Sequence, residues 1–107
     1  MGEPAIDLSE IMDLYKEDAR RAVEKMQAAL THWEEVRAAG PARQELRRLS
    51  HQMRGSGRTY GFRQVTRICK AMENIVLKLE KNKLPADDRA REALHRKVDR
   101  LAAVFSE

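Results

Sequence analysis

The spacing of the apolar residues constrains the fold of this chain more than any other feature. They recur almost everywhere with a period close to 3.6 residues, and no stretch alternates as a β-strand would. Turn signals divide the periodic sequence into four segments, at about residues 7–38, 42–59, 62–81 and 87–105. Each segment predicts an amphipathic helix with one apolar face to bury.

Local signals support the ends of the first segment. Asp7, with Glu10 three residues later, resembles a capping box. The tripeptide Ala39–Pro41 predicts the end, with its glycine as the C-terminal cap and its proline in the first turn of the next helix. A helix of about 30 residues is long for a globular protein. The first segment is therefore expected to form either one long helix or a helix with a break or bend near Glu17–Ala19.

The connections between the four segments are short, so neighbouring helices should run antiparallel. The expected fold is all-α: an antiparallel up-down-up-down four-helix bundle with a long or bent first helix. A strict heptad coiled coil is less expected, because turn signals interrupt the pattern. With 107 residues the chain suits a single domain, residues 1–107, with one hydrophobic core.

The composition of the chain limits the cellular environments and the classes of binding partner that we expect for it. No apolar run approaches the roughly 20 residues that span a bilayer, and the start MGEPAIDLSE lacks a signal-peptide core. We expect a cytoplasmic protein without a membrane segment. The single cysteine, Cys69, excludes an internal disulfide and a cysteine-based zinc site. The net charge of +4 comes from mixed charges typical of solvated helix faces, which is a poor argument for nucleic acid.

A helical wheel of the second segment places His51 at the centre of the exposed face. The opposite, core face carries Leu46, Leu49, Met53, Ser56 and Tyr60. Four arginines surround the histidine on its own face: Arg47, Arg48, Arg54 and Arg58. Their charge and forked donors suit an anion such as a phosphoryl group.

Gly55 lies one turn beyond His51 on the same face. Glycine costs roughly 1 kcal/mol relative to alanine inside a helix, and a casual surface histidine would leave it unexplained. A missing side chain at this position leaves the imidazole open to a partner. We expect Gly57 to allow close packing near the helix end and Gly61 to make the turn.

The hairpin formed by the second and third helices places Glu73 level with His51, because its turn lies near residues 61–62. A carboxylate that accepts the Nδ1–H of a histidine fixes the tautomer and leaves Nε2 as the nucleophile. Geometry alone leaves a second interpretation open, in which Glu73 is a boundary residue paired with Lys70 or Lys78.

The stretch HQMRGSGRTYGF resembles the signature of histidine phosphotransfer (Hpt) domains, which is His-x-hydrophobic-[Lys/Arg]-Gly-Ser-[small]-x-x-hydrophobic-Gly. Eight residues fill that pattern in order: His51, Met53, Arg54, Gly55, Ser56, Gly57, Tyr60 and Gly61. The continuation ICKAME, residues 68–73, is similar to the family's motif LCxxLE on the following helix. The likeness covers essentially the whole chain.

The resemblance implies a role for each matched residue. His51 is the phospho-accepting histidine, and Arg54 stands where the family has a basic residue near the phosphoryl group. Gly55 matches the glycine that keeps the approach open, and Glu73 matches the side chain that hydrogen-bonds the ring. Cys69 coincides with a frequent family cysteine, which we interpret as a small core residue.

The resemblance also implies the partners, which are receiver domains of response regulators or hybrid histidine kinases. A phosphoryl group would pass between receiver aspartates through His51. Arg47, Arg48 and Arg58 would steer an acidic receiver, whereas Leu8 and Ile11 either dock the receiver or make plain core contacts. Magnesium is expected on the receiver, with no cofactor or metal in this chain. No nucleotide-binding loop is present, so no ATP-dependent kinase activity is expected.

Other functions remain open at this stage. The chain could be a non-catalytic helical adaptor that binds receivers, or a plain protein-interaction module in which His51 is dispensable. A basic module for nucleic acid is disfavoured, because no helix-turn-helix pattern is present and Tyr60 is the single aromatic residue near the arginines. A monomer is the default expectation. Both a whole protein and a domain of a hybrid kinase are compatible with the sequence.

Overall fold

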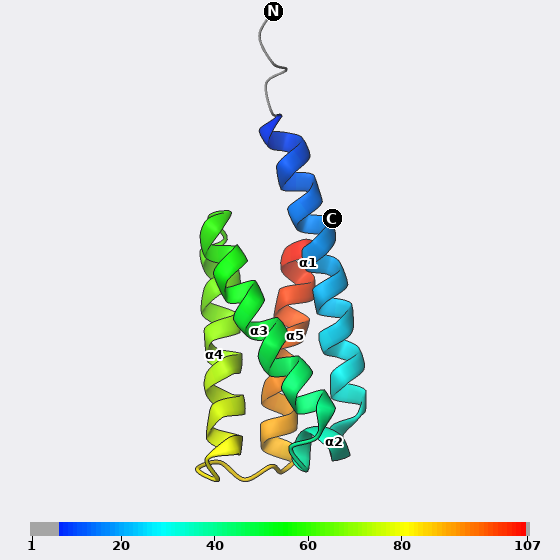
Figure 1. Ribbon diagram of the computed structural model, residues 1–107, viewed down its shortest axis with the longest axis vertical. Coiled ribbons are helices and arrows are strands. Elements are labelled where there is room, and N and C mark those ends of the chain that lie inside the picture. The colour runs from blue at the N-terminus through cyan, green and yellow to red at the C-terminus, as the bar shows by residue number, and fades with distance from the viewer. Residues whose placement is uncertain (1–6, 107) are drawn as a thin grey trace, which may run out of the picture.

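The computed structural model describes residues 7–106, which form a bundle of helices without a strand in that range (Figure 1). The helices are α1 (Leu8–Thr31), α2 (Trp33–Arg37), α3 (Pro41–Thr59), α4 (Arg63–Glu80) and α5 (Asp88–Phe105). The four long helices run alternately up and down, and α2 is a short addition after α1. The predicted all-α bundle is confirmed, and its last three helices agree with the predicted bounds to within one residue.

The predicted first helix is wrong in one respect. It ends at Thr31, and the break lies at His32 rather than near Glu17–Ala19, where α1 is continuous. His32 has φ −99° and ψ 53°, outside the helical region, and its N–H donates to the carbonyl of Ala29, three residues back. The apolar pattern continues through the break into the buried residues of α2, so periodicity alone could not reveal it.

An aspartate caps the start of two helices. The carboxylate of Asp7 accepts from the N–H of Ser9 at 2.9 Å, and that of Asp87 accepts from the N–H of Ala90 at 3.1 Å. Such caps satisfy donors that a helix end leaves without a partner, and each stabilises its helix by about 1 kcal/mol. The predicted start of α1 at Asp7 is confirmed.

Three helices end on a residue in the left-handed conformation: Ala39 (φ 60°), Gly61 (φ 81°) and Asn82 (φ 55°). The expectation that Gly40 caps the first segment is therefore wrong, because the left-handed residue is Ala39. Gly40 has φ −81° and serves a close approach instead, since its N–H donates to the carbonyl of Glu35 at 2.7 Å. Gly61 makes the turn between α3 and α4, as predicted.

The core lies between the apolar faces of the four long helices. α3 packs against α1 and α4, and α5 packs against the same two helices, so α3 and α5 lie diagonally across the bundle. The largest fully buried side chains are those of Phe105, Met26, Leu30, Leu46, Met72, Leu94 and Leu101. Burial of each such side chain contributes about 1.5–3 kcal/mol.

α1 extends beyond the ends of the other long helices (Figure 1). At the level where they end, the ring of Tyr15 stacks on Tyr60 at 4.4 Å and lies 5.2 Å from Phe62 and 5.9 Å from Phe105. Past this aromatic cluster the α1 stripe becomes more exposed: Met12 still packs against the core, whereas Leu8 is 78% exposed. Of the two interpretations of Leu8, the core contact is therefore wrong. The predicted core position of Tyr60 is wrong as well, because Tyr60 follows the last residue of α3 and is 37% exposed.

Gly57 allows α3 and α4 to approach closely, as the sequence predicts. A Cβ atom at this position would lie 3.0 Å from both Val65 Cγ1 and Thr66 Oγ1. In addition, the N–H of Phe62 donates to the carbonyl of Gly57 at 2.7 Å. This close contact fixes the register of the α3–α4 hairpin.

Arg43 is a buried residue that the sequence did not single out. It is 5% exposed, and its guanidinium donates to the carbonyls of Val36 at 2.5 Å and Arg37 at 2.9 Å. These carbonyls belong to the last turn of α2, where regular helical hydrogen bonds end, and that of Val36 also accepts from the N–H of Ala39 at 3.4 Å. Arg43 therefore joins α2 to α3.

In the described range no helix is both long and apolar enough to cross a membrane.

Candidate functional site

α3 presents His51 to the outside of the bundle, as the helical wheel predicts. Its side chain is 69% exposed, whereas Leu46, Leu49 and Met53 on the opposite face are buried. The helix thus uses one face for the core and leaves the imidazole accessible near its middle.

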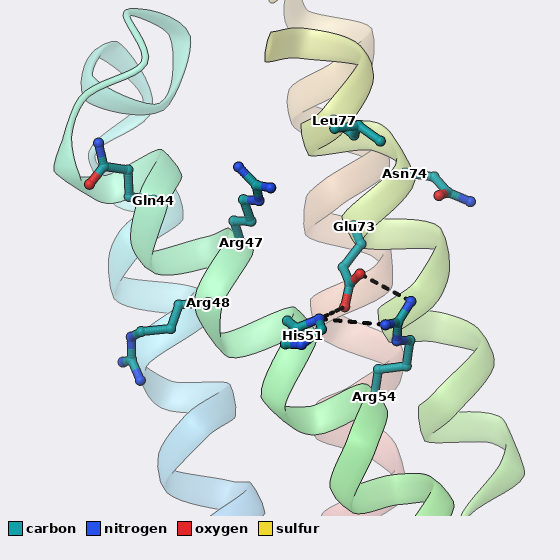
Figure 2. A pocket seen from close by; sticks show the side chains of 8 residues that line it. All are labelled: Gln44, Arg47, Arg48, His51, Arg54, Glu73, Asn74 and Leu77. Atoms are coloured by element: carbon teal, nitrogen blue, oxygen red, sulfur yellow. Dashed lines mark hydrogen bonds and ion pairs between the residues drawn. The ribbon is translucent and has the colours of Figure 1, made fainter. Parts of the chain in front are cut away.

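Glu73 of α4 reaches the histidine from the side (Figure 2). Its Oε1 lies 3.4 Å from His51 Nδ1, and its side chain is only 18% exposed. The second interpretation, an ordinary pair with Lys70 or Lys78, is wrong, because Glu73 contacts His51 and Arg54 instead. The hairpin register set at Gly57 brings these residues together.

Arg54 completes a group of three with His51 and Glu73. Its Nη1 lies 3.2 Å from Glu73 Oε2, and its Nη2 lies 3.5 Å from His51 Nδ1. In Figure 2 the guanidinium lies beside the carboxylate. Arg54 is thus held against α4, one turn along from the imidazole, and is 38% exposed.

His51 Nδ1 faces an acceptor and a donor at similar distances, so its proton decides which contact is favourable. Glu73 Oε1 is buried and has no hydrogen bond at the present geometry within residues 7–106. An unsatisfied buried oxygen costs about 1–3 kcal/mol, and a proton on Nδ1 offers it a donor. Arg54 already has Glu73 Oε2 as its partner. The geometry therefore favours the Nδ1–H tautomer, with the lone pair of Nε2 directed outward.

A hollow of about 600 Å³ lies beside the imidazole in the outer groove between α3 and α4. Its lining comprises Gln44, Arg47, Arg48, His51, Arg54, Glu73, Asn74 and Leu77. The helical wheel also places Gln44 on the face of His51. Sequence reasoning missed Asn74 and Leu77, although the register that finds Glu73 also places Leu77 level with Arg47. One side of the hollow is cationic and the other carries the carboxylate of Glu73.

The two arginines before His51 are oriented differently. Arg47 leans over the hollow (Figure 2), and its Nη1 lies 3.1 Å from Glu80 Oε2 of α4. Arg48 points away from the histidine and is paired with Glu45 at 2.7 Å, a contact that raises the pKa of Arg48 and lowers that of Glu45. Arg47 is therefore better placed to meet an anion at the imidazole.

The other predicted contact residues lie outside this hollow. Arg58, two turns beyond His51, lines a separate hollow at the α3–α4 turn. Leu8 is exposed and Ile11 is half-buried on the extending end of α1. The structure thus brings His51, Arg54, Glu73 and Arg47 together, whereas Arg58 lies at the turn end of α3 and Leu8 and Ile11 lie on the extending end of α1.

Gly55 has no structural reason to be glycine. A Cβ atom at this position would meet no atom within 4 Å, in contrast to the crowded position of Gly57. The open space lies one turn from His51, on the exposed face of α3. An alanine would therefore fit the folded protein.

Cys69 lies behind the site and is fully buried. Burial, and secondarily the negative charge of Glu73, raises the pKa of its thiol to about 12. The thiol stays protonated at neutral pH and packs as a small apolar side chain, as interpreted from the sequence. Within residues 7–106 no three His, Cys, Asp or Glu side chains are grouped as a metal site.

The sequence pattern that defines the Hpt domain matches residues 10–104, which include every residue of the histidine site. The chain belongs to the Hpt domain family. Hpt domains act in histidine phosphotransfer in two-component systems, as phosphocarrier modules rather than kinases, and interact with receiver domains. Comparison with curated proteins and with solved structures finds no match.

Proposed function

We propose that this Hpt domain carries a phosphoryl group between receiver-domain aspartates as phosphohistidine at Nε2 of His51. The observation that supports this most directly is the placement of the imidazole. Its Nδ1 faces the buried Oε1 of Glu73, and its Nε2 makes no hydrogen bond or ion pair with any residue of the described range. A neutral imidazole held in this way is a nucleophile that needs no base.

The transfer step balances without an external proton acceptor. The Nε2 lone pair attacks the phosphorus of an aspartyl phosphate in line, and the bond between phosphorus and the aspartate oxygen breaks. The aspartate leaves as a carboxylate, and the ring keeps its Nδ1 proton and gains positive charge. Glu73, 3.4 Å from Nδ1, stabilises that charge. The reverse step returns the phosphoryl group to another aspartate.

Two arginines would stabilise the phosphoryl oxygens. Arg54 and Arg47 lie on the turns after and before His51, and each is oriented by a glutamate of α4, Glu73 or Glu80. Phosphoryl transfer depends mainly on positioning and on stabilisation of charge. Guanidinium groups that are already held in place lose little freedom when the anion arrives.

The partner would dock over the exposed face of α3. Gly55 leaves room for its backbone next to the imidazole, and the extending end of α1 offers the apolar residues Leu8 and Ile11. Magnesium would be supplied by the receiver, where it would neutralise the aspartyl phosphate. Arg48 and Arg58 would act on the approach and docking of the receiver rather than on the phosphoryl group, since neither lies over Nε2.

The test is phosphoryl transfer from a panel of radiolabelled phospho-receivers to three forms of the protein: wild type, His51→Gln and His95→Gln. The matched control places the same substitution on α5, away from the site. We expect acid-labile, base-stable label on the wild type and on His95→Gln, and none on His51→Gln. Absence of label from every receiver, with folding confirmed by circular dichroism, would support the alternative of a non-catalytic receiver-binding adaptor.

A further inference from the structure

The charge of the chain is unevenly distributed. Residues 41–86, which contain α3 and α4, carry eleven Lys and Arg against three Asp and Glu, a net charge of +8. The remainder of the chain has a net charge of −4. The modest total of +4 thus conceals a strongly basic hairpin. That hairpin is the part of the molecule that presents His51.

Cations continue along the α3–α4 groove past the histidine site. A second hollow at the turn end of this groove is lined by Gly57, Arg58, Gly61, Arg63, Thr66 and Arg67. Arg63 and Arg67 also border a hollow towards α5 that contains Lys97 and Arg100. Neither the hollow at the turn end nor the hollow towards α5 is lined by an Asp or Glu residue. We call Arg58, Arg63 and Arg67 the turn-end cluster.

The arginines of the turn-end cluster differ from those nearer the other end of α3. Arg47, Arg48 and Arg54 are each paired with a glutamate at 2.7–3.2 Å. In the described range no member of the turn-end cluster makes an ion pair or a side-chain hydrogen bond. Its guanidinium donors are therefore available to an anionic surface. Until such a surface binds, the three positive charges repel one another.

The cluster lies within the area that a partner at His51 would cover. A typical interface buries about 800 Å² on each protein, which corresponds to a disc of about 16 Å radius. Arg58 is seven residues from His51 on the same helix, or about 10 Å along its axis, and Arg67 lines the same hollow as Arg58. A receiver centred on the imidazole would therefore contact the cluster.

We propose that the turn-end cluster is a docking surface for an acidic patch beside the phosphoaspartate pocket of the partner receiver, so that the cluster selects which receiver is used. This inference rests on the proposed function. A protein partner is favoured over nucleic acid, because an apolar residue lines the groove: Leu77 borders the hollow at His51 and is 38% exposed. Because the cluster lies away from the reacting imidazole, its charge would act mainly on the rate at which the receiver associates.

The test reverses two charges of the cluster in Arg63→Glu/Arg67→Glu. The matched control is Arg89→Glu/Arg91→Glu, which has the same net charge and alters exposed residues near the start of α5, diagonally across from α3. At about 50 mM salt we expect kcat/KM for transfer from the cognate phospho-receiver to fall about tenfold in the cluster variant and less than twofold in the control. The difference should shrink at about 500 mM salt. The rate at saturating receiver should not change in either variant.

Equal losses in the two variants would overturn the proposal, since net charge rather than the cluster would then govern docking. Receiver binding measured by calorimetry on a His51→Gln background separates this inference from the proposed function. Binding that depends on the cluster, without transfer by the wild type, would uphold the docking surface and refute the relay. Receiver binding that is equally strong with and without the cluster substitutions would refute the docking surface and leave the proposed function intact. Binding of a 20-base-pair DNA that is lost in the cluster variant would identify the partner as nucleic acid and overturn the proposal.

Discussion

Replacement of Gly55 separates a structural role of this glycine from a functional one. Glycine inside an exposed helix is about 0.5–1 kcal/mol less stable than alanine. The added methyl group would meet no atom within 4 Å, so no clash offsets the gain. We therefore expect Gly55→Ala to stabilise the fold by about 0.5–1 kcal/mol and to raise Tm by about 2–8 °C.

The same substitution should impair transfer. Side chains four residues apart on a helix have Cβ atoms about 6 Å apart, so a larger side chain at residue 55 intrudes on the space in front of His51. A methyl group forced into a packed contact costs about 1–3 kcal/mol, which corresponds to roughly tenfold or more in rate. We expect about a tenfold loss of kcat/KM for Gly55→Ala and about a hundredfold loss for Gly55→Leu.

Thermal unfolding and single-turnover transfer from a phospho-receiver would be measured on both variants. Ala103→Leu is the control for an added surface side chain, because Ala103 is an exposed residue of α5. A fall in Tm for Gly55→Ala would show that the glycine serves the fold. Unchanged transfer in Gly55→Leu would show that no partner needs this space, and either result would refute the reasoning.

Three further predictions rest on contacts and burial in the structure. Gly57→Ala places a Cβ 3.0 Å from Val65 Cγ1, so it should reduce the free energy of unfolding by about 1–3 kcal/mol in urea titrations; an increase would contradict the tight packing. Cys69, whose pKa is raised to about 12, should resist iodoacetamide at pH 8 in the folded protein and react once the protein unfolds in urea. Rapid alkylation of the native protein would contradict its burial. Glu73→Gln keeps the shape but removes the charge that stabilises the ring, so we expect a loss of about tenfold in the single-turnover rate with an unchanged Tm, and an unchanged rate would exclude that electrostatic role.

Much of the fold could be predicted from the sequence, because the features that specify it are local. The 3.6-residue period, the aspartate caps and the turn at Gly61 depend on near neighbours in the chain, and α3, α4 and α5 lie where these signals place them. The break at His32 could not be predicted, since apolar residues continue in phase on both sides of it. The left-handed Ala39 was missed because propensity favours glycine, and Gly40 follows it.

The site was predicted where it depends on helix periodicity and hairpin register. Both fix the face of His51 and the level of Glu73, and the structure agrees with both. The orientation of individual side chains could not be predicted from the sequence, because it depends on contacts between helices. Arg47 turns towards Glu80 and the hollow, whereas Arg48 turns away to Glu45, although both share the exposed face of α3 on the wheel.

The central claim is that Nε2 of His51 carries the phosphoryl group while Nδ1 faces Glu73. The most direct test is nitrogen-15 NMR of the histidine rings after phosphorylation by a receiver, with long-range couplings used to assign the two ring nitrogens. The account predicts a phosphorus–nitrogen bond at Nε2 of His51, a proton on Nδ1, and unchanged spectra for His32 and His95. A phosphoryl group on Nδ1 of His51, or on another residue, would contradict it.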